Sequence, residues 1–195
     1  LTMPGTERIA GFPTHVVRVG GGVRRVLFIH CTLGSVATWT KVQAPLLSKL
    51  AMTAFDRPSH GDSAEWNGDG GAGGLHTLTT TIAAALIDGR ADIVGHSYGA
   101  TVALRLALDL PHRVRSLTLI EGIGPPEMEP RHPAARLRAW LDGVAKARHK
   151  NKRPISDARH ALKRMRVQNP ELGDELGLFL AAKSTKPVDG GLQWS

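Results

Sequence analysis

The first 120 residues alternate apolar runs with stretches in which apolar residues recur every three or four positions. The apolar runs have the length and β-branched content of strands and lie at 15–19, 25–30, 51–55, 91–96 and 114–120. The periodic stretches between them predict helices at 37–50, 75–87 and 98–110. Strands that alternate with helices in this way predict an α/β fold with a mostly parallel sheet and flanking helices.

The pattern changes after residue 124, where four prolines between 125 and 133 form a hinge. Three helices without intervening strands are predicted beyond it, at 134–150, at 156–168 with Ser156 as N-cap, and from Asn169 with Pro170 at N1. The sequence therefore predicts a core at 1–124, a helical unit at 125–184 and a segment at 185–195 that returns toward the core.

Composition narrows the class of protein. Of 195 residues, 42% are hydrophobic and 22% charged, an ordinary balance for a soluble globular chain. The single cysteine, Cys31, excludes a disulfide within the chain and indicates a reducing compartment. No apolar run approaches the ~20 residues that span a bilayer, and residues 1–11 lack the order of a signal peptide. We expect a cytoplasmic protein with no membrane partner.

The net charge of +8 is concentrated in the helical unit. Residues 131–166 contain 12 Lys and Arg against two aspartates, which gives this segment a charge of +10. Such a cluster fits nucleic-acid binding, a solvated outer face, or steering of anionic substrates. The apolar stripe of the 134–150 helix favours a solvated face over an apolar pocket, so we expect no nucleic-acid partner.

The segment Gly95-His-Ser-Tyr-Gly99 has the form G-x-S-x-G. It follows an apolar strand directly and precedes a helix directly, the context of a nucleophile elbow. Such a turn is strained, so the residues two positions before and after the serine must be small, as Gly95 and Gly99 are. The pattern predicts Ser97 as a nucleophile facing the positive end of a helix. The alternative is an ordinary βα turn in which Ser97 only caps that helix.

Two further segments complete a resemblance to the α/β-hydrolase superfamily over residues 16–121. His30-Cys-Thr32 follows a buried strand, and residues 56–63 are similar to the turn D-x-x-G-H-G-x-S, with Ser59 in place of glycine. The helical unit at 125–184 resembles the cap of esterase- and lipase-like members. The resemblance implies an oxyanion hole built from the N–H groups of Thr32 and Tyr98, with Cys31 as a small residue in a usual glycine position. It implies a structural role for the 56–63 turn, with His60 as a packing histidine.

The resemblance also implies a serine–acid–histidine triad, and here the sequence departs from the family. No segment resembles the last strands, which carry the usual acid and histidine, so we expect a truncated chain without measurable Ser97-dependent hydrolysis. Glu121 is the one carboxylate at an acid-bearing strand end, and it is equally interpretable as a surface residue. None of the nine histidines is placed as a base. An unpaired edge at the 114–120 strand predicts self-association.

Two functions follow from these patterns. The first is a serine hydrolase that acts on a small ester or related acyl compound through an acyl-enzyme at Ser97. The second is a non-catalytic binding module that keeps the hydrolase fold but has lost the triad. The histidines and carboxylates show no metal-ligand spacing, so neither metal nor organic cofactor is expected.

Overall fold

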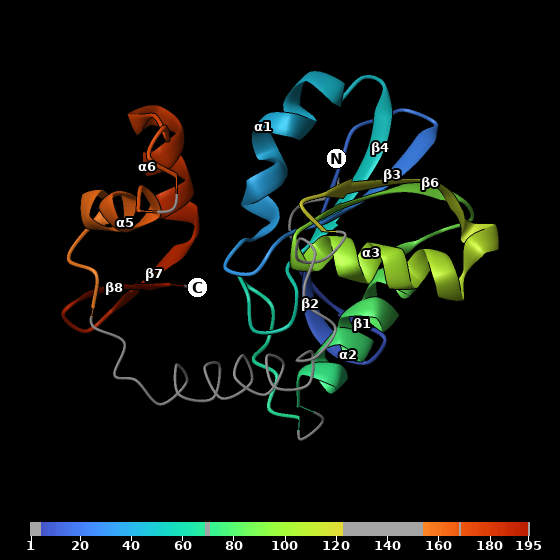
Figure 1. Ribbon diagram of the computed structural model, residues 1–195, viewed down its shortest axis with the longest axis horizontal. Helices are drawn as coiled ribbons and strands as arrows, with labels where there is room; N and C mark the ends of the chain where they lie inside the picture. The colour runs from blue at the N-terminus through green and yellow to red at the C-terminus, as the bar shows by residue number, and fades with distance from the viewer. Residues whose placement is uncertain (1–4, 69–70, 123–153, 168, 195) are drawn as a thin grey trace, which may run out of the picture.

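The computed structural model describes residues 5–68, 71–122, 154–167 and 169–194 (Figure 1). They form a six-stranded sheet flanked by helices and, beside it, a smaller unit of two helices and a hairpin (Figure 1). This arrangement confirms the α/β fold class predicted from the alternating pattern.

The sheet has the strand order β1-β2-β4-β3-β5-β6. The strands are β1 (Gly5–Ile9), β2 (Phe12–Val19), β3 (Arg24–Ile29), β4 (Leu50–Phe55), β5 (Ala91–His96) and β6 (Val114–Ile120). β1 pairs antiparallel with β2, and β2 pairs antiparallel with β4. The pairs β3–β4, β3–β5 and β5–β6 are parallel. The carboxyl ends of β3, β5 and β6 therefore meet at one edge of the sheet, where the sequence places its candidate site.

Strand β3 is buried on both faces, as its continuous apolar run predicts. Leu27 and Ile29 point to a core shared with α2 (Gly71–Leu86) and α3 (Tyr98–Asp109). Phe28 points the other way and packs against Trp39, with ring centroids 5.1 Å apart. Alternation along one strand thus anchors helices on both faces. No described helix has both the length and the apolar character required to cross a membrane.

The segment after β3 differs from its prediction. Instead of one helix over 37–50, three short turns follow one another: η1 (Val36–Trp39), α1 (Thr40–Gln43) and η2 (Ala44–Leu46). Pro45 is the second residue of η2 and cannot donate the N–H that a longer helix needs, which accounts for the break. β1 was not predicted at all.

The smaller unit contains α5 (Ala158–Met165) and α6 (Asp174–Lys183). Asp157, not Ser156, caps α5 by accepting the His160 N–H at 2.8 Å. The predicted start of the last helix at Pro170 is wrong, because residues 169–172 form a turn closed by the bond from Leu172 N–H to the Asn169 carbonyl. The predicted helix over 134–150 lies outside the described residues.

Residues 185–194 form a hairpin of β7 (Thr185–Val188) and β8 (Gly191–Trp194), which the sequence did not reveal. Leu192 and Ile155 exchange two backbone hydrogen bonds of 2.8 and 2.7 Å, so the hairpin closes onto the start of the unit. An exposed ion pair between Lys41 and Glu175, 3.3 Å long, links the unit to the core. The division of the chain at residues 124 and 184 stays a prediction.

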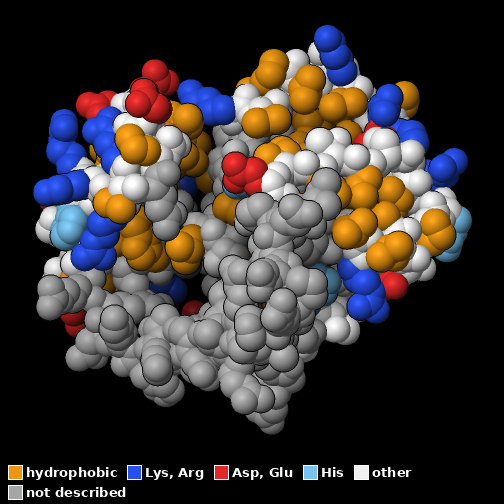
Figure 2. All heavy atoms as spheres, in the orientation of Figure 1, with side chains coloured by type: hydrophobic (Ala, Val, Ile, Leu, Met, Phe, Trp, Pro, Cys, Tyr) orange, Lys and Arg blue, Asp and Glu red, His pale blue; other side chains and the backbone are white. Residues whose placement is uncertain are grey.

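One side of the core carries exposed apolar groups. Within the described ranges β6 pairs only with β5. Beside it, Leu108 of α3 is 71% exposed and Leu104 is 39% exposed. Figure 2 shows hydrophobic side chains gathered over α3. This exposed apolar surface lies where the sequence predicts self-association, which stays a prediction.

Candidate active site

The turn that carries Ser97 joins β5, an interior strand of the sheet, to α3. Ser97 has φ 51° and ψ −116°, a conformation that residues with a side chain rarely adopt. Its N–H donates to the Ile120 carbonyl at 2.8 Å, so the end of β6 holds the turn in place. The prediction of a strained turn at Ser97 is confirmed. Its hydroxyl makes no capping bond to the helix, which removes the interpretation of Ser97 as a simple cap.

The two glycines of the turn are required by close backbone contacts. A Cβ atom on Gly95 would lie 2.4 Å from the Gly99 carbonyl oxygen. A Cβ atom on Gly99 would lie 2.2 Å from the Ile29 oxygen and 2.7 Å from the His30 oxygen. These distances are shorter than any normal carbon–oxygen contact. The first turn of α3 therefore packs directly on the carboxyl end of β3, which brings Tyr98 close to the loop after His30.

That loop turns sharply at Cys31–Gly34. The Gly34 N–H donates to the Cys31 carbonyl at 3.2 Å, and Leu33 has a positive φ of 63°. Thr32 is exposed, and its N–H has no partner among the residues that the structure describes. Tyr98 is the first residue of α3, where an N–H has no carbonyl one turn earlier to bond. Both amides that the sequence proposed for an oxyanion hole are thus unpaired within the described residues.

Arg57 contacts both the Cys31 loop and Tyr98, and it was assigned no role from the sequence. Its side chain is only 1% exposed. One guanidinium nitrogen, Nη2, donates to the Cys31 carbonyl at 2.9 Å and contacts His60 Nε2 at 3.0 Å. The guanidinium carbon also lies 4.4 Å from the centre of the Tyr98 ring, a cation–π contact. Burial lowers the pKa of Arg57 to about 10, so the group is charged at neutral pH.

The hydrogen bonds of His30 and His60 define their ring protons. His30 Nε2 accepts the backbone N–H of Arg57 at 3.0 Å. Nδ1 of His30 therefore carries the ring proton and donates to the Cys31 carbonyl at 2.8 Å. His60 Nε2 accepts from Arg57, so Nδ1 donates to the Pro58 carbonyl at 2.9 Å. Burial, with the Arg57 charge, lowers the pKa of both rings, to about 4 for His60. Both rings are neutral with both nitrogens engaged, which agrees with the packing role predicted for His60.

Asp56 connects the 56–63 turn to its neighbours. Its carboxylate accepts the Val36 N–H at 2.7 Å and the Asp62 N–H at 3.0 Å, and its carbonyl accepts the Ser63 hydroxyl at 2.6 Å. The first of these bonds ties the turn to the helix that follows the Cys31 loop. These contacts agree with the structural role that the resemblance implied.

Asp56 also belongs to a cluster of three described side chains whose atoms are close enough together to hold a metal ion. His15, Asp56 and Asp62 bring possible ligand atoms within 4.8 Å of one another. Both oxygens of Asp56 already accept backbone N–H groups, and burial raises the pKa of this carboxyl. Because the Asp56 carboxylate is engaged in holding the turn, we assign this group no metal.

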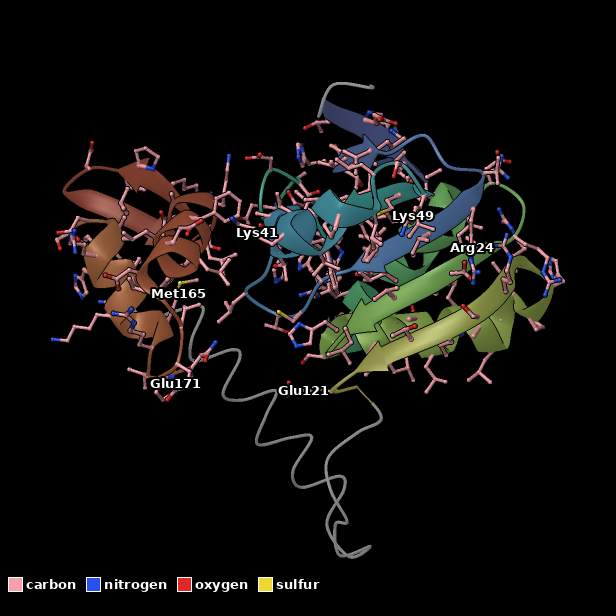
Figure 3. The ribbon with its side chains drawn as sticks, turned by 90° about the horizontal axis from the view of Figure 1, so that it is seen from above. Arg24, Lys41, Lys49, Glu121, Met165 and Glu171 are labelled. Carbon is pink, nitrogen blue, oxygen red and sulfur yellow. The ribbon has the colours of Figure 1, made fainter. Side chains whose placement is uncertain are left out.

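Glu121 follows β6 at the same edge of the sheet, as Figure 3 shows. It has a positive φ of 52°, and its side chain is 82% exposed. Its carboxylate lies 3.6 Å from His96 Nε2, the histidine directly before Ser97. Glu121 is therefore close to the Ser97 turn, where its carboxylate contacts His96. Its role as the acid of the triad stays a prediction.

Comparison with curated proteins finds several relatives of similar identity. An acetyltransferase component of an acetoin cleaving system from Cupriavidus necator is 34% identical over 120 residues, which cover 60% of this chain and 31% of that protein. An esterase from Mycobacterium tuberculosis is 34% identical over 121 residues, 61% of this chain and 40% of the esterase. The chain thus matches well under half the length of these relatives.

Comparison with solved structures covers more of the chain. The thioesterase domain from the curacin biosynthetic pathway superposes with a TM-score of 0.78 at 25% identity, over 98% of this chain and 71% of that domain. The family described as alpha/beta hydrolase fold matches residues 24–167, a range that contains the elbow, the Cys31 loop and Arg57. The chain belongs to the α/β-hydrolase fold family.

Proposed function

We propose that the protein is a serine hydrolase of small esters or related acyl compounds, with Ser97 as its nucleophile. The observation that carries the proposal is the strained Ser97 turn at the end of β5, where the N–H of the adjacent Tyr98 has no partner among the described residues. Relatives named as an esterase and a lipase, both from Mycobacterium tuberculosis, support the ester as substrate class. The reaction takes place in the cytoplasm and needs no metal or organic cofactor.

The chemistry proceeds in two halves. The Ser97 hydroxyl attacks the ester carbonyl and loses its proton to a base, and the carbonyl oxygen becomes an anion held by the Thr32 and Tyr98 N–H groups. Collapse of this intermediate expels the alcohol, which takes the proton back from the base, and leaves an acyl group on Ser97. Water, deprotonated by the same base, attacks the acyl group and releases the carboxylic acid and the free serine.

The histidines at or just after the carboxyl ends of β3, β4 and β5 are not placed to act as the base. His30 and His60 have both ring nitrogens engaged. His96 has Glu121 as its described ionic contact. A serine hydroxyl without a base is a poor nucleophile at neutral pH. We therefore expect the 195-residue chain on its own to show no measurable Ser97-dependent hydrolysis.

Because His30, His60 and His96 are not placed to act as the base, the proposal is tested by chemical rescue with an added base. Imidazole, a small base that diffuses into the site, is added to the protein with p-nitrophenyl butyrate, and the rate is compared with that of Ser97→Ala. Ser184→Ala serves as the matched control, since Ser184 ends α6 away from the elbow. We expect imidazole to restore ester cleavage and transient acylation, seen by intact mass, in the wild type and in Ser184→Ala. Equal rates in wild type and Ser97→Ala at every imidazole concentration would favour the rival, a binding module without chemistry.

A further inference from the structure

The buried charge of Arg57 has no counter-ion among the residues that the structure describes. Arg57 forms no ion pair there, and its Nε atom is buried without a hydrogen-bond partner. Burial raises the pKa of its neighbours Cys31 and Tyr98, so thiol and phenol are both neutral and supply no negative charge. A buried, uncompensated cation is costly to a fold. Its position beside the proposed oxyanion site suggests which anion offsets that cost.

The geometry of one peptide group connects Arg57 to this site. The Cys31 carbonyl accepts three donors: Arg57 Nη2 at 2.9 Å, His30 Nδ1 at 2.8 Å and the Gly34 N–H at 3.2 Å. The same planar peptide carries the Thr32 N–H, which points opposite to the carbonyl in a trans peptide. Fixing the carbonyl therefore fixes the Thr32 N–H in the direction away from the guanidinium. A carbonyl bonded to a cation also polarises its peptide and strengthens the N–H as a donor.

Tyr98, which carries the second amide, contacts the same guanidinium through its ring. The Tyr98 ring rests on Arg57, with 4.4 Å from the guanidinium carbon to the ring centre. Since Gly99 packs on the oxygens of Ile29 and His30, the Tyr98 backbone is fixed next to the Cys31 loop. One buried cation thus contacts the carbonyl of the peptide that carries the Thr32 N–H and the ring of Tyr98.

We propose that Arg57 is a positioning residue for an anion site at the Thr32 and Tyr98 amides. It orients the Cys31–Thr32 peptide through the carbonyl, and it supplies positive charge under both donors. The inference rests on the proposed function in so far as the anion is the ester-derived oxyanion, and it extends to a carboxylate product at the same position. Arg57 itself touches no reacting atom in this scheme.

Anion binding tests the inference without requiring catalysis. Butyrate is titrated into ¹⁵N-labelled protein, and the Thr32 and Tyr98 amide resonances are followed by NMR. We expect both to shift with one dissociation constant, which rises at least tenfold in Arg57→Met and no more than about threefold in Arg57→Lys. Arg57→Gln, which keeps a donor for the Cys31 carbonyl but no charge, should resemble Arg57→Met. Arg25→Met is the matched control, because Arg25 is half-exposed and pairs with Asp88.

The imidazole-supported assay provides the second readout. Arg57→Met should lower the maximal rate at least tenfold while KM changes less than threefold, since the charge acts on the intermediate. If Arg57→Met does not fold, Arg57→Lys against Arg57→Gln decides the same question. Butyrate affinity independent of Arg57, or unresponsive Thr32 and Tyr98 amides, would overturn the inference. Arg57-dependent butyrate binding without Ser97-dependent cleavage would instead refute the proposed hydrolysis and leave the anion site standing.

Discussion

Acidification tests the contact between Arg57 and His60 described above. Burial, together with the Arg57 charge, lowers the pKa of His60 to about 4, against the 6.5 of an unperturbed ring. Between these two values the unfolded chain binds a proton that the folded protein does not, so His60 contributes stability above pH 6.5 that is lost as the pH falls toward 4. Protonation also removes the acceptor that Nε2 offers to Arg57 Nη2.

The size of the effect follows from the difference between the two pKa values. A shift of this size corresponds to a loss of about 2.5 kcal/mol between pH 7.5 and pH 4.5. Since the His60 side chain keeps some contact with solvent, we expect about 2 kcal/mol. His30 acts in the same direction, and the raised pKa of Asp56 acts in the opposite one, so the wild-type profile alone is not diagnostic.

The assay is urea unfolding of the wild type and of His60→Gln at pH 7.5 and 4.5. Glutamine retains an oxygen that can accept from Arg57 but does not titrate, so the variant should lose about 2 kcal/mol less on acidification than the wild type. His112→Gln, which changes an exposed histidine, should follow the wild type within about 0.5 kcal/mol. Equal losses in the wild type and His60→Gln would refute the neutral, Arg57-bonded state of His60.

Two further predictions concern packing and assembly. Gly99→Ala places a Cβ atom 2.2 Å from the Ile29 oxygen and should lower the free energy of unfolding, measured by urea denaturation, by about 1–3 kcal/mol. Gly21→Ala, which has open space at its Cβ, should change that free energy by less than about 0.5 kcal/mol. Equal effects of the two substitutions would contradict the close contact at Gly99. The β6 edge and the exposed α3 leucines should make the chain self-associate in sedimentation velocity, and Leu108→Lys should weaken the association. A mass of 20.9 kDa at all concentrations would show that this surface does not associate.

The sequence predicted best the elements that a contiguous stretch of residues defines by itself. The bounds of β5 and β6 agree with the predicted strands, because a short apolar run between polar turns is typical of a buried strand. The Ser97 turn was predicted for a similar reason, since the two glycines and the flanking strand and helix are contiguous in sequence. Where a single residue interrupts the pattern, as Pro45 does, apolar spacing alone overestimated the helix.

Arg57 could not be predicted because its environment is assembled from distant segments. Its carbonyl partner, Cys31, is 26 residues away in the chain, and Tyr98 comes from a third segment. An arginine in a loop is ordinarily a solvated residue, and only the closure of these segments over its side chain excludes water. Neighbouring features of the same turn, such as Asp56, carried a family pattern, whereas position 57 carried none.

The paired backbone of Ile155 and Leu192 gives the smaller unit the topology of a closed ring. The polypeptide enters at Ile155, passes through α5, α6 and β7, and comes back alongside its own starting point on β8. A piece whose two ends are already side by side can be exchanged for one of different length without moving its attachment points. The segment between Ile155 and Leu192 can therefore change in length and sequence, in evolution or by design, while the Ser97 turn and the buried Arg57 stay unchanged.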